Sequence, residues 1–150
     1  KATPGPAVEY DFVARDIAEM TAGMQIEQIA FDRYRMGTLQ KELDRAGVVL
    51  PFVPFGQGYV SMAPAIDATE IEFLHKRVRH GGHPVLTMCA ATAVMVSDPA
   101  GNRKLDKSKS TGRIDGMVAL AMAMGAAKAG EVEMVSVSPW DDPNFSLVEA

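Results

Sequence analysis

The sequence predicts an α/β fold in which helices and strands alternate and at least two strands run parallel. Segments with apolar residues at helical spacing alternate with short apolar runs that are typical of buried strands. The chain has 150 residues, of which 47% are hydrophobic. This length and composition fit one compact domain with a substantial core.

The first half of the chain contains three predicted helices and two predicted strands. In the first helix, Phe12, Val13, Ile17 and Met20 recur at helical spacing, and Gly23 suits the helix end. Apolar runs that follow the first two helices indicate strands, and Gly81-Gly82 ends the third helix. The predicted helices cover residues 10–22, 38–46 and 64–79, and the predicted strands cover residues 24–31 and 48–55.

The second half has a weaker pattern. Residues 83–96 are apolar and fit either a helix or a strand. Turn-forming residues at 97–102 separate two short segments that we interpret as a hairpin. A final helix is predicted from residue 111 or 112, because its alanines favour helix and its apolar residues share one face. We therefore predict a domain at residues 1–130 and an acidic C-terminal arm or linker at residues 131–150.

Charge is unevenly distributed along the chain. The net charge is −4, yet residues 99–113 contain five Lys or Arg and one acid, Asp106. Residues 131–150 contain five acids and no Lys or Arg. Basic segments are most often solvated loops, but this one is also a candidate phosphate-binding loop. Its candidate residues are Arg103, Lys104, Lys107, Lys109 and Arg113.

Several protein classes are disfavoured. No run of 18 apolar residues and no signal-peptide pattern is present, so we expect a soluble protein that is neither secreted nor inserted in a membrane. Cys89, the single cysteine, has no partner for an internal disulfide and is expected to be a packed residue in a reducing, intracellular setting. The three histidines match no standard zinc spacing. Lys1 and the Pro-Gly-Pro that follows suggest the interior of a longer polypeptide.

Two aspartates are candidate site residues. Asp32 follows a predicted buried strand, and sites in α/β proteins lie beyond such strand ends. Asp115 lies in the first turn of the last helix, beside the basic loop. If the fold brings these two carboxylates together, they favour the binding of Mg²⁺ or Mn²⁺. A pair of such ions can catalyse the hydrolysis of a phosphodiester. Taken singly, Asp32 also fits a turn residue and Asp115 a helix-start acid. The adjacency of loop and acid favours the catalytic interpretation.

Four stretches in consistent order resemble the nuclease domain of the large terminase subunit of tailed bacteriophages. They are residues 29–35 (Ile-Ala-Phe-Asp-Arg-Tyr-Arg), 55–65 (Phe-Gly-Gln-Gly-Tyr-Val-Ser-Met-Ala-Pro-Ala), 80–86 (His-Gly-Gly-His-Pro-Val-Leu) and 107–123 (Lys-Ser-Lys-Ser-Thr-Gly-Arg-Ile-Asp-Gly-Met-Val-Ala-Leu-Ala-Met-Ala). The resemblance covers about residues 4–127. It implies a ribonuclease H-like, resolvase/integrase-type three-layer fold, of which residues 1–130 would be a part. On this resemblance, Asp32 and Asp115 match the family's second and last metal-binding acids.

The resemblance also implies a function and partners. The family cuts concatemeric viral DNA with two Mg²⁺ or Mn²⁺ ions, works at the procapsid in the bacterial cytoplasm, and meets double-stranded DNA, the portal protein and the small terminase subunit. The family's first metal-binding aspartate lies on a strand upstream of a segment like residues 4–11, and residues 1–31 contain no such strand. We therefore expect an incomplete nuclease domain whose exposed strand edge at residues 24–31 favours self-association. A resolvase- or transposase-type nuclease and a non-catalytic DNA-binding module are the alternatives.

Overall fold

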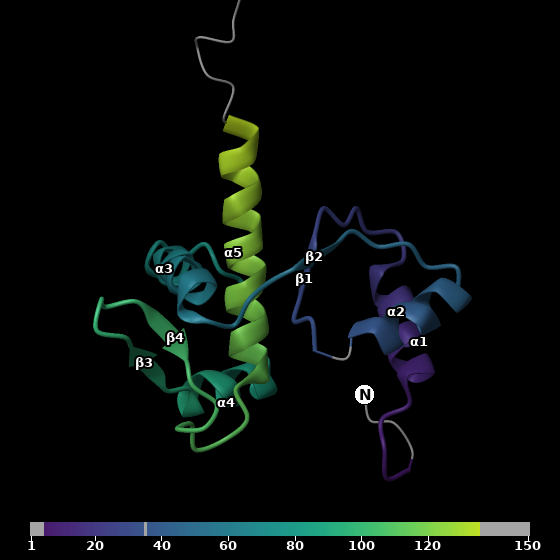
Figure 1. Cartoon of the computed structure of the whole chain (residues 1–150), viewed down its shortest axis with the longest axis horizontal. Coiled ribbons are helices and arrows are strands. Elements are labelled where there is room, and N and C mark those ends of the chain that lie inside the picture. Colours follow the sequence, from purple (N-terminus) through teal and green to yellow (C-terminus); the bar gives the residue numbers. More distant parts are fainter. Residues whose placement is uncertain (1–4, 35, 136–150) are drawn as a thin grey trace, which may run out of the picture.

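The computed structural model describes residues 5–34 and 36–135, the last five of them as backbone only. The elements in chain order are α1 (Tyr10–Thr21), β1 (Ile29–Phe31), α2 (Met36–Arg45), β2 (Phe52–Pro54), α3 (Tyr59–Leu74), α4 (Pro84–Thr92), β3 (Met95–Ser97), β4 (Arg103–Leu105) and α5 (Asp115–Val135). Figure 1 shows α1 and α2 on one side, α3, α4, α5 and the β3–β4 pair on the other, and β1 and β2 between them. The predicted alternation of helices and strands is confirmed from α1 to α3, after which two helices and two strands follow one another directly.

The helices α1 and α2 pack against each other and enclose a small core. Ala14 of α1 and Leu43 of α2 are both buried. The prediction for α1 is confirmed within one residue at its C-terminal end. Gly23 follows with a φ of +74°, a left-handed conformation that glycine adopts without steric strain.

The strands β1 and β2 run parallel, as predicted, and α2 provides the crossover. Ala30 pairs with Val53 at the centre of the register. Both strands are shorter than predicted, because residues 24–28, 48–51 and 55 lie outside the paired segments. Met24 and Val49 in these segments are largely exposed. Apolar composition therefore led to an overestimate of strand length in segments that do not pair with a neighbouring strand.

The helix α3 begins and ends five residues earlier than predicted. Pro64 was expected to start it, but the helix begins at Tyr59 and contains Pro64 inside. Proline removes one backbone hydrogen bond there. Burial of Met62, Ala65 and Ile66 offsets this loss. The helix ends at Leu74, two residues before Lys76 takes a φ of +57°.

The ambiguous segment 83–96 contains both a helix and a strand. It forms α4, with Pro84 in the first turn, and then β3. Proline suits that position because the first N–H groups of a helix have no intrahelical partner. The strands β3 and β4 then pair antiparallel, with Met95 opposite Leu105. The predicted hairpin is confirmed.

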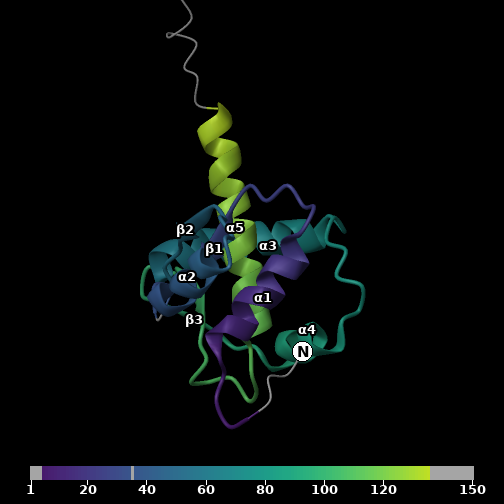
Figure 2. The same cartoon turned by 90° about the vertical axis from the view of Figure 1, so that its right-hand side faces the viewer.

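The helix α5 forms the centre of the larger core. Figure 2 shows this long helix rising through the middle of the molecule. The core between α3 and α5 consists of Met62, Ile66, Ile114, Val118, Ala121 and Met122. The helix begins at Asp115, later than predicted, and continues past the expected domain boundary at residue 130. The rest of the predicted arm, residues 136–150, lies outside the described residues.

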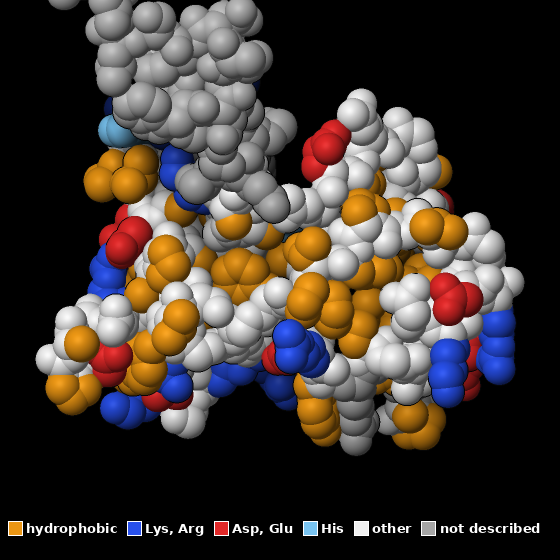
Figure 3. All heavy atoms as spheres, turned by 45° about the horizontal axis from the view of Figure 1, so that its top comes forward, with side chains coloured by type: hydrophobic (Ala, Val, Ile, Leu, Met, Phe, Trp, Pro, Cys, Tyr) orange, Lys and Arg blue, Asp and Glu red, His pale blue; other side chains and the backbone are white. Residues whose placement is uncertain are grey.

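Apolar side chains are not confined to the core. Figure 3 shows them gathered across the middle of one face, with acidic and basic side chains on either side. None of the helices in the described part of the chain is both long enough and apolar enough to cross a membrane.

Candidate functional site

Packing fixes the position of Asp115 at the start of α5. Its neighbour Ile114 is 1% exposed and belongs to the core. On the other side, a Cβ placed on Gly116 would lie 3.2 Å from the Sγ of Cys89, so α4 lies close against this first turn. Cys89 is buried, as predicted. The Asp115 side chain is 63% exposed, so a carboxylate reaches solvent from a well-anchored backbone.

A compact loop brings Lys107 to this carboxylate. Asp106 Oδ1 accepts hydrogen bonds from the backbone N–H of Ser108 at 2.9 Å and from its hydroxyl at 2.6 Å. Ser110 Oγ accepts the backbone N–H of Val94 at 3.1 Å, which attaches the loop to the base of the hairpin. Lys107 Nζ lies 2.8 Å from Asp115 Oδ1.

The positive charges beside Asp115 keep it ionised. The hydrogen bond from Lys107 holds the pKa of the Asp115 carboxyl below its ordinary value, and the nearby charges of Lys107 and Arg113 add to this effect. The positive end of the α5 dipole acts in the same direction. Asp115 is therefore a carboxylate at neutral pH.

A surface hollow of about 480 Å³ joins the loop to the start of α5. Its lining residues are Lys107, Ser110, Thr111, Gly112, Arg113, Ile114 and Asp115. The hollow thus places two cations and one carboxylate around a single space. Cations of this kind bind phosphate oxygens, and a carboxylate oxygen is a hard ligand that suits Mg²⁺ or Mn²⁺.

Asp32 lies directly after β1, as predicted, and is exposed. Its Oδ1 accepts the backbone N–H of Tyr34 at 3.1 Å, which is the short-range bond of a turn residue. Within residues 5–34 and 36–135, no hydrogen bond or ion pair joins Asp32 to Asp115. No group of three or more His, Cys, Asp or Glu in this part of the chain is arranged to hold a metal ion.

The five candidate cations fall into two sets. Arg103 and Lys104 are directed to α3: Arg103 bonds Asp67 and Glu70, and Lys104 Nζ lies 4.9 Å from the centre of the Tyr59 ring. The two acids raise the pKa of Arg103 above its ordinary value. The remaining set, Lys107, Lys109 and Arg113, lies in the loop before α5.

Sequence reasoning missed the acids that receive Arg103. Asp67 and Glu70 stand three residues apart on α3, a spacing that puts both side chains on one helix face. That spacing indicates a charged pair, but it does not identify a partner 33 residues away. The roles of Arg103 and Lys104 in DNA binding remain predictions.

The histidines lie in the exposed connection between α3 and α4. His80 Nδ1 accepts the backbone N–H of Gly82 at 3.1 Å, and the His80 ring lies 6.3 Å from that of Phe73. His75 Nδ1 lies 2.7 Å from Arg77 Nη1. These contacts lie within the connection and the last turn of α3 and do not reach Asp115.

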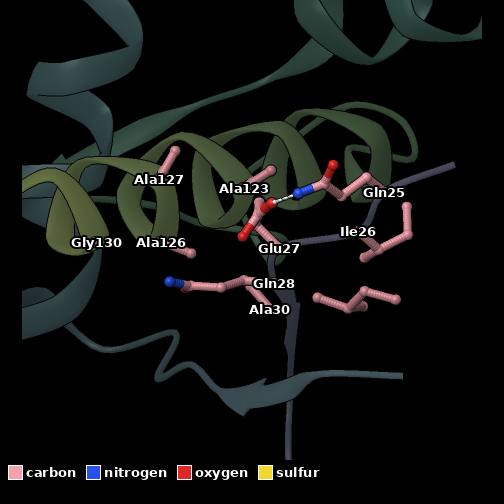
Figure 4. Close-up of a pocket in the computed structure, with 10 residues that line it drawn as sticks. Gln25, Ile26, Glu27, Gln28, Ala30, Ala123, Ala126, Ala127 and Gly130 are labelled. Atoms are coloured by element: carbon pink, nitrogen blue, oxygen red, sulfur yellow. Dashed lines mark hydrogen bonds between the residues drawn. The ribbon is translucent and has the colours of Figure 1, made fainter. Parts of the chain in front are cut away.

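A second hollow, of about 830 Å³, lies between the chain leading into β1 and the C-terminal half of α5. Figure 4 shows Gln25, Glu27 and Gln28 facing the small residues of α5. The α5 lining consists of Ala123, Ala126, Ala127 and Gly130. Among the described strands, β1 pairs with β2 only, so its other edge stands beside this hollow.

Comparison with known proteins gives consistent matches. The family model for the terminase large subunit, endonuclease domain, matches residues 2–131. The chain is 57% identical over 132 residues to the "Terminase, large subunit" of Enterobacteria phage HK97, covering 88% of this chain and 26% of that protein. It is 27% identical over 133 residues to "Protein YmfN" of Escherichia coli K12, covering 87% of this chain and 29% of that protein.

A solved structure agrees. The crystal structure of the HK97 bacteriophage large terminase matches with a TM-score of 0.79 and 56% identity, over 84% of this chain and 26% of that one. The chain thus spans between a quarter and a third of the length of the relatives that it matches.

Proposed function

Because this chain belongs to the family of terminase large subunit endonuclease domains, we propose that it hydrolyses DNA phosphodiesters with the help of divalent metal ions. Its α/β fold is the ribonuclease H-like fold of that family, as predicted. The proposed substrate is concatemeric double-stranded viral DNA, which the longer protein would cut during packaging.

The observation that carries the proposal is the hollow at the start of α5. It combines a carboxylate, Asp115, with the cations Lys107 and Arg113 on one exposed surface. A nuclease site needs both kinds of group, because phosphate oxygens bind cations and the metal binds carboxylates. The anchoring of Asp115 by Ile114 and Gly116 supplies the rigidity that such a site requires.

The chemistry of the donor set fits a magnesium or manganese ion. Asp115 has hard oxygen donors on an exposed surface, and the ammonium of Lys107 already occupies a cation position beside one of them. Mg²⁺ is commonly bound by one or two carboxylates together with waters and substrate phosphates. We propose that Asp115 and Asp32 hold the ions. When bound, such ions activate water and stabilise the leaving oxygen of a phosphodiester.

The cations of the loop would position the DNA. Lys107, Lys109 and Arg113 would contact backbone phosphates, which contribute affinity with little sequence preference. Arg103 and Lys104 would lie at the edge of this surface while they contact α3. By the same family relationship we propose that the longer protein meets the portal protein and the small terminase subunit at the procapsid in the bacterial cytoplasm.

Nicking of supercoiled plasmid in Mn²⁺ tests the proposal. Two proteins are compared: this chain, and this chain joined to the segment that precedes the matched region in the HK97 terminase. Each is measured beside its Asp115→Ala and Asp32→Ala variants, with circular dichroism to confirm folding. We expect the extended protein to nick the plasmid and both substitutions to reduce the rate by at least about a hundredfold, the usual scale for loss of a catalytic group.

One result of the nicking assay would contradict the nuclease proposal. If neither protein nicks DNA in Mn²⁺ while both bind it, the nuclease proposal is wrong for this chain. The basic loop would then belong to a DNA-binding module.

A further inference from the structure

We propose that Lys107 couples the binding of DNA to the binding of the metal ion, by holding Asp115 until a phosphate draws the lysine away. This inference rests on the proposed function, since it assumes that Asp115 is a metal ligand and that Lys107 contacts phosphate. It adds a device that the proposed function does not require: an internal cation that competes with the metal.

The loop is built in a way that presents Lys107 to Asp115. Asp106 closes the turn through both polar groups of Ser108, and Ser110 fastens it to Val94 at the base of the hairpin. Only the flexible stem of Lys107 then separates this anchored turn from its partner. The ammonium lies 2.8 Å from Asp115 Oδ1, between this anchored turn and the packed start of α5.

One ammonium group has two competing partners at this site. While Lys107 bonds Oδ1 of Asp115, its positive charge opposes a divalent ion at the same carboxylate. Lys107 also lines the open hollow and its side chain is 53% exposed, so it can turn outward without unfolding the loop. A DNA phosphate in the hollow offers the lysine a second anion. Transfer to that phosphate leaves Asp115 free for the metal.

Thermodynamic linkage makes the effect reciprocal. If DNA strengthens metal binding by removing Lys107 from Asp115, then the metal strengthens DNA binding by the same factor. The metal-free site is meanwhile held in an ion pair rather than left as an exposed carboxylate. Its affinity for divalent ions would be low until DNA is present.

Lys109 provides a matched control. It carries the same charge in the same loop, but the ion pair with Asp115 is formed by Lys107, while the charge of Lys109 helps to lower the pKa of Asp106. Replacing Lys107 or Lys109 by methionine removes one positive charge and keeps the length of the side chain. Only the first replacement removes the competitor at Asp115.

The experiment measures Mn²⁺ affinity by electron paramagnetic resonance for the extended protein of the nicking assay and its Lys107→Met, Lys109→Met and Asp115→Ala variants. Each protein is measured alone and with a short DNA duplex, at low temperature, with gels that confirm an intact duplex. Without DNA, we expect Lys107→Met to bind Mn²⁺ about fivefold more tightly, the effect of one unit charge at ion-pair distance near water, and Lys109→Met to change little. With DNA, the gain in affinity should be smaller for Lys107→Met than for Lys109→Met.

The outcomes separate the two proposals. If Mn²⁺ binds to the extended protein, the Asp115→Ala variant loses it and Lys107→Met behaves like Lys109→Met, the coupling is wrong and the metal site stands. If the extended protein binds no Mn²⁺, or binds it without dependence on Asp115, both proposals are wrong. Equal tightening by the two lysine substitutions would also overturn the coupling, because it would indicate a general charge effect.

Discussion

Arg103 of β4 forms a two-bonded ion pair with Glu70 of α3. Its Nη1 donates to Oε1 at 2.9 Å and its Nη2 donates to Oε2 at 2.8 Å, and Nη2 also donates to Asp67. The planar guanidinium matches the carboxylate in this geometry, which lysine cannot reproduce. The β3–β4 hairpin is thereby attached to the helix that packs against α5.

We predict that Arg103→Met lowers the free energy of unfolding by about 1 kcal/mol. The pair is two-bonded and Arg103 is only 32% exposed, which favours the upper end of the range for surface pairs, while the exposed acids limit the gain. Urea denaturation measures the change. Lys109→Met, which removes a neighbouring charge with no such pair, is the control. Equal stability of the two variants would show that the ion pair contributes nothing.

The Lys107–Asp115 contact predicts a specific acid titration. Because the folded-state pKa of Asp115 is lowered, this group stabilises the fold above its unfolded-state pKa. That contribution is lost as pH falls through the folded-state pKa, below about pH 4. Carboxyl NMR should show the pKa of Asp115 rising toward its ordinary value in Lys107→Met and staying low in Lys109→Met. An unchanged pKa in both would mean that the lysine does not bond Asp115 in solution.

Local patterns predicted the elements that local interactions determine. The first helix was predicted within one residue, because helical spacing and Gly23 both lie in that stretch. The α4 segment could not be assigned, because it is apolar on all sides and has no periodicity, although Pro84 marked its start. The strands were predicted too long, because a backbone partner, which the sequence does not show, limits each one to three residues.

In the candidate site as well, a contact between residues close in the sequence was predictable and a contact between distant segments was not. Lys107 and Asp115 are eight residues apart and were expected to be neighbours, because one loop leads into one helix. The attachment of Arg103 to Glu70 joins segments far apart in the chain and depends on how the hairpin docks on α3. Sequence alone gave no reason to separate Arg103 from the other loop cations.

The crossing of α3 and α5 depends on Gly125. A Cβ at this position would lie 2.7 Å from Ala65 Cβ and 2.8 Å from Phe55 Cζ, closer than real side chains allow. We predict that Gly125→Ala lowers stability by about 1–3 kcal/mol, the usual cost of overpacking, despite alanine's better helix propensity. Thermal unfolding measures it. Gly37→Ala in α2 is the control, because a Cβ added there would lie more than 4 Å from the surrounding atoms of the described residues. That variant should be as stable as the parent or more so.

Removing two loop lysines should change how DNA binding responds to salt. The logarithm of DNA affinity falls linearly with the logarithm of salt concentration, and each phosphate contact adds about 0.9 to the steepness of this fall. We therefore predict that the Lys107→Met/Lys109→Met double variant has a slope shallower by about two units. The affinity should weaken to a similar extent for unrelated duplex sequences. Fluorescence anisotropy across a salt series measures this. As a control, the Lys41→Met/Arg45→Met double variant removes the same charge from α2 and should keep the slope of the parent protein. If the parent and both double variants had the same slope, the loop would be excluded as the DNA contact.

The free edge of β1 predicts self-association. Ile29 N–H donates to Pro51 and Phe31 C=O accepts from Phe55, so these groups face β2. Alternate residues of a strand direct their backbone groups to opposite edges. The backbone groups of Gln28 and Ala30 therefore point to the edge with which no described strand pairs, beside the hollow lined by α5. Light scattering of this chain should show a dimer whose fraction increases with protein concentration. Gln28→Pro removes one edge donor and should abolish it, whereas Gln28→Ala keeps the backbone N–H and should not. A monomer at all concentrations, or equal effects of the two substitutions, would show that this edge does not pair with a second copy.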